Sequence, residues 1–200
     1  MSLETVRSAY TARATEYIDL FGTIEAAAEQ DRGHLLAWAR AVRGRIVDVG
    51  CGPGQWTGFL HENGVDVEGV DPVPAFVEAA RRSHPGVAFR VGDAGCLDAD
   101  DASLGGVLAW YSLIHTAPTH LPALLEEFAR CIRPGGSLLL GFFLGPELTP
   151  FDHAVTTAYF WPVDQLTARV EEAGFTVSDI RTRVDAGVRP QGTLIADRCP

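Results

Sequence analysis

Hydrophobic positions along the chain follow two different periods. Short runs rich in β-branched residues predict strands over residues 46–49, 65–70, 87–91, 105–111, 137–143, 175–184 and 193–197. Segments with apolar residues at every third or fourth position predict helices over residues 3–20, 23–41, 56–61, 74–82, 121–132 and 159–173. Strands that alternate with helices in this way are typical of an α/β fold with a largely parallel sheet.

The length of the chain, 200 residues, suits a single domain with a substantial core. We expect residues 1–200 to form one domain, with helices over residues 1–42 preceding a core over residues 43–200. Residues 144–161 are predicted to be an irregular connection between the fifth strand and the next helix. Such connections often carry function, so this one is a candidate substrate loop; the alternative is a surface connector with solvated charges.

Three glycines at alternate positions, Gly50, Gly52 and Gly54, follow the first predicted strand and precede a predicted helix. Glycine allows positive φ angles and has no Cβ atom, so the backbone of such a turn lets a ligand approach closely. The following helix presents unpaired N–H groups at its N-terminus, which favour polar or anionic groups. The turn therefore predicts a site for a nucleotide-like cofactor.

The spacing of these glycines narrows the choice of cofactor. A dinucleotide-binding G-x-G-x-x-G pattern would need a third glycine at position 55 or 57, where the chain has Gln55 and Thr57. A phosphate-binding P-loop ends in Gly-Lys-Ser/Thr, and no lysine follows the turn. NAD, ATP and GTP are therefore disfavoured.

Two acids near this turn are candidates for binding or support. Asp71 ends the second predicted strand, about twenty residues after Gly50, where an acid reaches a ribose diol in doubly wound folds. Its alternative role is a helix cap, because a predicted helix follows. Asp48 lies within an apolar strand and needs a partner, because burying an unpaired acid costs several kcal/mol.

Composition excludes other classes of function. A net charge of −10 and a pI near 4.9 oppose nucleic-acid binding, which depends on clustered Lys and Arg. The four cysteines form no C-x-x-C pair and no zinc-site spacing, so we expect reduced thiols and no metal. The N-terminus lacks the pattern of a signal peptide, and no run of about twenty apolar residues would span a membrane. Together with an arginine-only basic composition, this predicts a soluble, cytoplasmic, bacterial protein.

The D-x-G-x-G-x-G turn over Asp48–Gly54 resembles motif I of the class I S-adenosylmethionine (SAM)-dependent methyltransferases. The segment Ala-Trp-Tyr-Ser-Leu-Ile-His, residues 109–115, is similar to small methyltransferases of actinobacterial type that act on metabolites. The resemblance extends over residues 10–197. It implies a doubly wound sheet of seven strands in the order 3-2-1-4-5-7-6, flanked by helices, with the last strand antiparallel. One departure is Gly105, where the family commonly has an acid.

The resemblance also implies where the cofactor binds. Asp71 would hold the ribose, Asp93 and Ala94 the adenine, and the tyrosines of an N-terminal helical lid the methionine end. The implied cofactor-binding residues are Asp48, Gly50, Cys51, Gly52, Gly54, Gln55, Asp71, Pro72, Asp93, Ala94, Trp110, Tyr10 and Tyr17. Each acid has a structural alternative, a turn in the case of Asp93, and the two tyrosines have the alternative of a stripe that packs on the core.

The acceptor end is less specified by the sequence. In this family the end of the fourth strand lies over the transferred methyl group, which makes Trp110 and Tyr111 pocket candidates. His115 and His153 are candidate general bases, since histidine titrates near neutral pH. For His115 a structural role is the alternative. Tyr111, Tyr159 and Trp161 are candidate substrate-binding residues.

The expected activity is transfer of a methyl group from SAM to a small-molecule acceptor, with release of S-adenosylhomocysteine. The small size leaves no separate recognition domain, which favours a small metabolite as acceptor. From the charge and the absence of a long apolar run we expect neither nucleic acid nor membrane as partner, and we expect a monomer or homodimer. A non-catalytic SAM-binding module is the first alternative. An NAD-dependent oxidoreductase is the second, and the glycine spacing opposes it.

Overall fold

The computed structural model describes residues 3–200; residues 1 and 2 of the predicted N-terminal segment lie outside the described residues. The helices are α1 Leu3–Ala12, α2 Ala14–Phe21, the short 3-10 helix η1 Ile24–Ala26, α3 Glu29–Ala41, α4 Gln55–Glu62, α5 Pro74–Ser83, α6 Leu121–Cys131 and α7 Val163–Glu172. The strands are β1 Ile46–Val49, β2 Val67–Asp71, β3 Phe89–Val91, β4 Leu104–Trp110, β5 Ile132–Leu144, β6 Thr149–Asp152, β7 Thr157–Trp161, β8 Phe175–Arg183 and β9 Gln191–Arg198.

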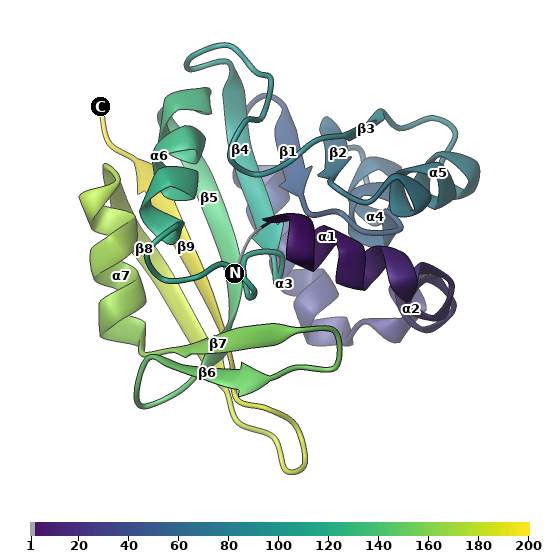
Figure 1. The fold of residues 1–200 in the computed structure, drawn as a ribbon. Helices are drawn as coiled ribbons and strands as arrows, with labels where there is room; N and C mark the ends of the chain where they lie inside the picture. The colour runs from purple at the N-terminus through teal and green to yellow at the C-terminus, as the bar shows by residue number, and fades with distance from the viewer. Residues whose placement is uncertain (1–2) are drawn as a thin grey trace.

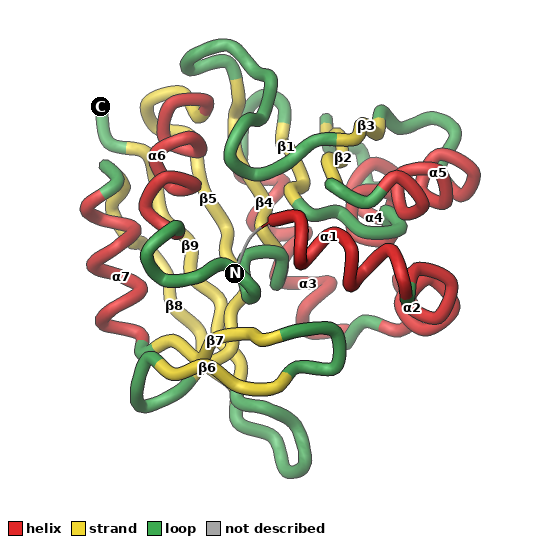
Figure 2. The backbone as a smooth tube through the Cα atoms, viewed as in Figure 1, coloured by secondary structure: helices red, strands yellow, loops and turns green. Residues whose placement is uncertain are grey.

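All nine strands found within residues 3–200 belong to one sheet, with helices on both sides (Figures 1 and 2). The strands β3, β2, β1, β4 and β5 follow one another in parallel. Strand β9 runs antiparallel beside β5 and carries β8 at its outer side. In order of predicted strands this is 3-2-1-4-5-7-6 with an antiparallel last strand, so the predicted fold is confirmed.

The segment over residues 144–161 differs from the prediction. In place of an irregular connection, β6 and β7 form an antiparallel hairpin inside it. Phe143 of β5 pairs with Gln191 of β9 on one edge and with Phe160 of β7 on the other, so β7 continues the edge along which β4 runs. These strands are short and β6 contains Pro150, which leaves too little alternation to be recognised in the sequence. Figure 1 shows the hairpin crossing the lower end of the sheet.

Alternate residues of β1 face opposite layers of the core. Ile46 lies in a buried cluster with Trp38 of α3 and Leu60 of α4. Val47 lies in a second cluster with Phe128 of α6 and Val170 of α7. Both faces of the central strands are therefore covered, which explains why their sequences are continuous apolar runs.

The N-terminal helices α1 and α2 lie outside these two layers. Helix α2 is attached through Ala14, which is buried with Val73 and Phe76 at the start of α5. Helix α1 has no buried residue and lies near the carboxyl ends of the strands, where it closes one side of a cavity (Figure 1). None of the helices in the described part of the chain is long and apolar enough to cross a membrane.

Candidate functional site

The turn after β1 has the conformation expected from its glycines. Gly50, Gly52 and Gly54 have φ angles of 69°, 56° and 86°, in the left-handed region that favours glycine. The N–H groups of Gly50 and Cys51 donate to the carbonyl oxygen of Val70, at 2.7 and 3.1 Å. These bonds hold the turn against the end of β2 and leave its outer side open to the carboxyl edge of the sheet.

Asp71, the last residue of β2, is tied to this turn. Its Oδ2 accepts the N–H of Gly52 at 2.9 Å, and its Oδ1 accepts the N–H of Val73 at 2.8 Å. Burial raises the pKa of Asp71 to about 6, and the two backbone donors oppose that shift. The N-terminal cap of α5 is Val73, so Asp71 is not the cap residue. Each carboxylate oxygen still has a free lone pair for a hydroxyl group.

Asp48 is buried on the other side of the turn. Its Oδ2 accepts the hydroxyl proton of Thr57 at 2.7 Å, and burial raises its pKa to about 7. The contact connects β1 to α4 and provides the partner that a buried acid requires. Asp48 does not line the cavity described next.

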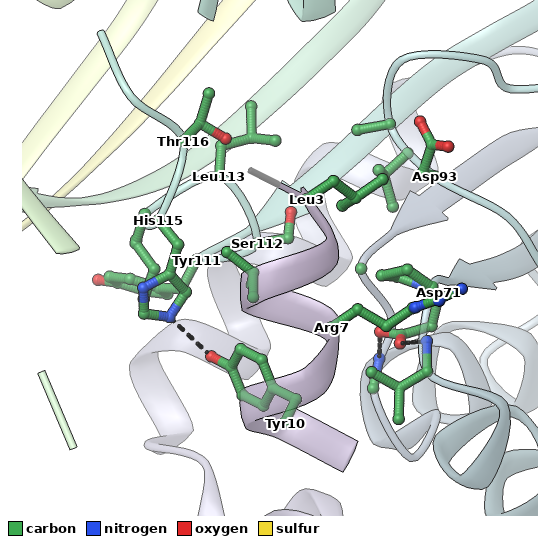
Figure 3. A pocket seen from close by; sticks show the side chains of 18 of the residues that line it. Leu3, Arg7, Tyr10, Asp71, Asp93, Tyr111, Ser112, Leu113, His115 and Thr116 are labelled. Atoms are coloured by element: carbon green, nitrogen blue, oxygen red, sulfur yellow. Dashed lines mark hydrogen bonds between the residues drawn. The ribbon is translucent and has the colours of Figure 1, made fainter. Parts of the chain in front are cut away.

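A cavity of about 410 Å³ lies at the carboxyl ends of the strands (Figure 3). Of the predicted site residues, it is lined by Tyr10, Tyr17, Gly50, Gly52, Asp71, Pro72, Asp93, Ala94, Trp110, Tyr111, His115 and His153. Asp93 also stabilises the turn that follows it, because its Oδ1 accepts the N–H of Gly95 at 2.7 Å. Figure 3 shows Asp71 and Asp93 on one side of the cavity and Tyr111 and His115 on the other.

The backbone is strained directly after β4, where the chain meets this cavity. Tyr111 has a φ of 55°, which is uncommon for a residue with a side chain and costs about 1–3 kcal/mol. Its ring packs at 5.0 Å from that of Trp110 and at 5.4 Å from that of Phe143. A Cβ at Gly141 would lie 3.0 Å from both Trp110 and Tyr111, so glycine there makes room for this packing.

His115 is buried at the far end of the cavity and is bonded at both nitrogens. Nδ1 lies 2.8 Å from the carbonyl oxygen of Thr157, and Nε2 lies 3.0 Å from the hydroxyl oxygen of Tyr10. A carbonyl oxygen only accepts, so we assign the ring proton to Nδ1, and Nε2 accepts the Tyr10 proton. Burial lowers the pKa of His115, which favours this neutral form.

His153, in the loop that joins β6 and β7, lies against His115. The two rings are 5.2 Å apart. Burial lowers the pKa of His153 to about 4, and the nearby positive charges of Arg189 and Arg13 act in the same direction. Two neutral histidines from segments 38 positions apart in sequence therefore meet at one end of the cavity.

Residues 46–136, which contain the turn and both cavity acids, match a family model described as a methyltransferase domain. They form a class I methyltransferase domain.

Two bacterial methyltransferases are among the relatives of this domain. A demethylmenaquinone methyltransferase of Beutenbergia cavernae is 34% identical over 108 residues, 54% of this chain and 44% of that protein. A phthiotriol/phenolphthiotriol dimycocerosates methyltransferase of Mycobacterium leprae is 32% identical over 159 residues, 74% of this chain and 55% of that protein. The chain thus spans about half the length of these relatives.

The fold also matches a solved methyltransferase. The structure of Burkholderia thailandensis 1,6-didemethyltoxoflavin-N1-methyltransferase, with 1,6-didemethyltoxoflavin and S-adenosylhomocysteine bound, has a TM-score of 0.81. The match covers 98% of this chain and 88% of that chain at 20% identity. At this identity the likeness establishes the fold of the methyltransferase domain and its surroundings.

The predicted site residues outside the cavity have identifiable places in the methyltransferase domain or beside it. Asp48, Cys51, Gly54 and Gln55 lie behind or beside the glycine turn and do not line the cavity. Trp161 has only 4% of its surface exposed and belongs to the core cluster of α6 and α7; Tyr159 packs against the same cluster. The direction of these two aromatic side chains depends on the unpredicted strand β7, so the sequence alone did not indicate it.

Sixteen residues that line the cavity were not predicted as site residues. They are Leu3, Val6, Arg7, Phe21, Val49, Val73, Phe76, Gly92, Gly95, Ser112, Leu113, Ile114, Thr116, His120, Leu124 and Phe143. Arg7 could have been predicted as a cavity residue from the sequence, because it lies three residues before Tyr10 on one helix and residues at this spacing share a face. Ser112 had a signal too, as a polar residue directly after a strand at the carboxyl edge. The apolar members are indistinguishable from core residues in the sequence.

Proposed function

We propose that this protein transfers a methyl group from SAM to a small-molecule acceptor and releases S-adenosylhomocysteine. One observation carries the proposal: the glycine turn, Asp71 and Asp93 line a single cavity at the carboxyl edge of a methyltransferase fold. The methyltransferase with bound S-adenosylhomocysteine that shares the fold supports it.

The residues present fit this cofactor. Gly50 and Gly52 bring bare backbone to the cavity, so a ligand can approach without meeting a Cβ. The Oγ of Ser112 is buried and has no hydrogen-bond partner among the described residues. Since a buried polar atom without a partner is costly, a polar ligand group in the cavity that bonds Ser112 would be stabilising.

Each binding role is assigned to a place in the cavity. Asp71 would hold the ribose hydroxyls, and Asp93, with Ala94 and Pro72, would hold the adenine. Tyr10, Tyr17 and Trp110 would enclose the methionine end, where aromatic faces attract a positive charge. Asp48, Cys51, Gly54 and Gln55 would keep the turn in shape from outside the cavity.

When bound, SAM supplies a methyl group activated by a positively charged sulfur. The protein's contribution is then to align an acceptor and exclude water, which can lower a barrier by about 7–11 kcal/mol. His115 is the better candidate base of the two histidines, because Thr157 fixes its Nδ1 proton and leaves the Nε2 lone pair on the side of Tyr10. A proton from the acceptor would reach Nε2 through the Tyr10 hydroxyl, which passes its own proton to Nε2 and takes up the proton of the acceptor.

The proposal extends to organisation and setting. We take residues 1–200 as one domain, with residues 1–42 as a lid over the core 43–200 and residues 144–161 as part of the acceptor side. We place the protein in the bacterial cytoplasm, as a monomer or homodimer that does not bind nucleic acid. The net charge of −10, the free thiols of all four cysteines and the bacterial relatives support this.

A calorimetric titration with S-adenosylhomocysteine tests the cofactor. We expect binding with a dissociation constant on the order of micromolar or lower, no binding of NAD, and loss of binding in Asp71→Ala. The matched control is Asp66→Ala, since Asp66 is an exposed acid whose carboxylate pairs with Arg45 at the surface. Binding of NAD, or binding of neither ligand, would refute the proposal.

Turnover then separates the two histidines. We expect His115→Gln to lower kcat with little change in the affinity for S-adenosylhomocysteine, and His153→Gln to have the smaller effect on kcat. Equal kcat for wild type and His115→Gln across the pH range would remove His115 from proton transfer. Cofactor binding without methylation of any acceptor would favour a non-catalytic SAM-binding module.

A further inference from the structure

The end of the cavity beyond β4 has a chemistry of its own. It is formed by the segment after β4, the end of β5, the β6–β7 hairpin and the inner face of α1 (Figures 1 and 3). Its side chains are mostly aromatic: Tyr10, Tyr111, Leu113, His115, Phe143 and His153. Because Asp71 and Asp93, the acids proposed to hold the ribose and adenine, lie at the opposite end, this end is where the acceptor of the proposed function would bind.

No charged side chain is among the residues named above for this end of the cavity. The two cations that act on His153 do not line the cavity: Arg189 lies over the ring of Phe151, and Arg13 pairs with Glu16 at 2.8 Å. Both acids that line the cavity, Asp71 and Asp93, lie at the other end (Figure 3). Both histidines have lowered pKa values and are neutral at pH 7. Arg7 is paired with Glu4 at 2.7 Å, and its side chain extends towards Asp71 in Figure 3. A carboxylate or phosphate at the acceptor end would therefore be desolvated without a cation in the cavity wall to pair with it, which is unfavourable.

Phe143 is the centre of the aromatic surface. Its ring lies 5.4 Å from Tyr111, 5.4 Å from Phe151, 6.0 Å from His153 and 6.5 Å from Phe160. Ring pairs at these separations are stabilised beyond the burial of their area. A planar aromatic ligand would extend this arrangement, whereas a saturated ligand of equal size would only bury area.

The direction of the hydrogen bond between Tyr10 and His115 determines which ligand groups can bond to the pair. The Nδ1 proton of His115 is donated to Thr157, so the hydroxyl proton of Tyr10 is donated to Nε2. The Tyr10 oxygen then has lone pairs but no free proton. A ligand group that meets it must donate a hydrogen bond, which a hydroxyl or N–H can do and a carboxylate cannot.

We propose that the acceptor is an uncharged aromatic molecule whose hydroxyl or ring N–H donates to the Tyr10–His115 pair while its ring packs on Phe143. That the bound molecule is a methyl acceptor rests on the proposed function, whereas the binding preference follows from the side chains of the cavity. It selects phenol-like and heterocyclic N–H compounds over carboxylic acids and phosphorylated compounds.

Three probes of similar size and different chemistry test the inference: 2-naphthol, 2-naphthoate and trans-2-decalol. Binding is measured calorimetrically, with and without saturating S-adenosylhomocysteine. We expect 2-naphthol to bind at least about tenfold more tightly than 2-naphthoate and about 3- to 10-fold more tightly than the decalol. Equal or tighter binding of the naphthoate or the decalol would overturn the inference.

A matched pair of variants locates the binding. Phe143→Leu should weaken 2-naphthol about threefold or more, without changing the affinity for S-adenosylhomocysteine. The control is Phe59→Leu: Phe59 lies on α4, packs against the core cluster that contains Trp38 and does not line the cavity. This variant should leave 2-naphthol binding unchanged. An equal loss in both variants would place the ligand elsewhere and refute the inference. If S-adenosylhomocysteine fails to bind, the proposed function falls, and the ranking of the probes on the protein alone still decides this inference.

Discussion

Replacing Gly50 by alanine adds one methyl group where the turn after β1 meets the segment after β4. Gly50 has a φ of 69°, and a Cβ built there would lie 2.3 Å from the Cβ of Ser112 and 3.3 Å from its Oγ. Ordinary contacts of such atoms begin at 3.4 Å. The two segments would have to separate by about 1 Å, and both line the proposed cofactor site.

The size of the effect follows from two separate terms. A residue with a Cβ in the left-handed region costs about 1–2 kcal/mol. Overpacking of a tightly packed site costs about a further 1–3 kcal/mol. We therefore expect Gly50→Ala to lower the free energy of unfolding by about 2–5 kcal/mol. A domain with a typical stability of about 5–15 kcal/mol would still fold.

Urea unfolding of matched variants separates the two terms. Gly64 has a φ of 82°, and a Cβ added there would meet no atom within 4 Å, so Gly64→Ala carries only the backbone term. Adding Ser112→Gly to Gly50→Ala removes the Cβ contact and should recover about 1–3 kcal/mol as a coupling energy. In the same samples, affinity for S-adenosylhomocysteine should fall about tenfold or more in Gly50→Ala and stay unchanged in Gly64→Ala.

Two results would refute this reasoning. Equal losses of stability in Gly50→Ala and Gly64→Ala would mean that the contact with Ser112 carries no energy. A double variant no more stable than Gly50→Ala would mean that the strain is relieved somewhere other than at Ser112.

Three further predictions concern side chains around the cavity. Tyr10→Phe removes one hydrogen bond to His115, so it should lower stability by about 0.5–1.5 kcal/mol and slow methyl transfer while S-adenosylhomocysteine still binds; an unchanged rate would contradict the proposed proton path. Thr57→Val leaves buried Asp48 without its side-chain partner, so urea unfolding should show a loss of about 1–3 kcal/mol. Because burial raises the pKa of Asp48 to about 7, the folded state holds that proton more tightly than the unfolded state does. We therefore expect the free energy of unfolding of wild type minus that of Asp48→Asn to be highest below about pH 4 and to fall as the pH rises through about 7. If this difference stays constant with pH, Asp48 does not titrate in this range.

The convergence of the glycine turn, Asp71 and Asp93 on one cavity could be predicted because the signals for it are local in the sequence. The glycine turn follows β1 directly, Asp71 ends β2, and Asp93 comes two residues after β3. Parallel strands in a doubly wound sheet bring their carboxyl ends to one edge, so three short motifs define a common site without knowledge of any long-range contact. The strand order was predictable only through the resemblance to class I methyltransferases that these motifs carry.

The acceptor side was decided by tertiary structure. Tyr10 and His115 are 105 residues apart, and their hydrogen bond depends on how α1 lies over the sheet. The β6–β7 hairpin exists because β5 extends past the end of β4 and offers it a free edge, and Trp161 turns into the core as a consequence. The sequence by itself determined which residue types follow each strand. Their partners, tautomers and orientations depend on atoms from distant segments, and only the folded chain places those atoms together.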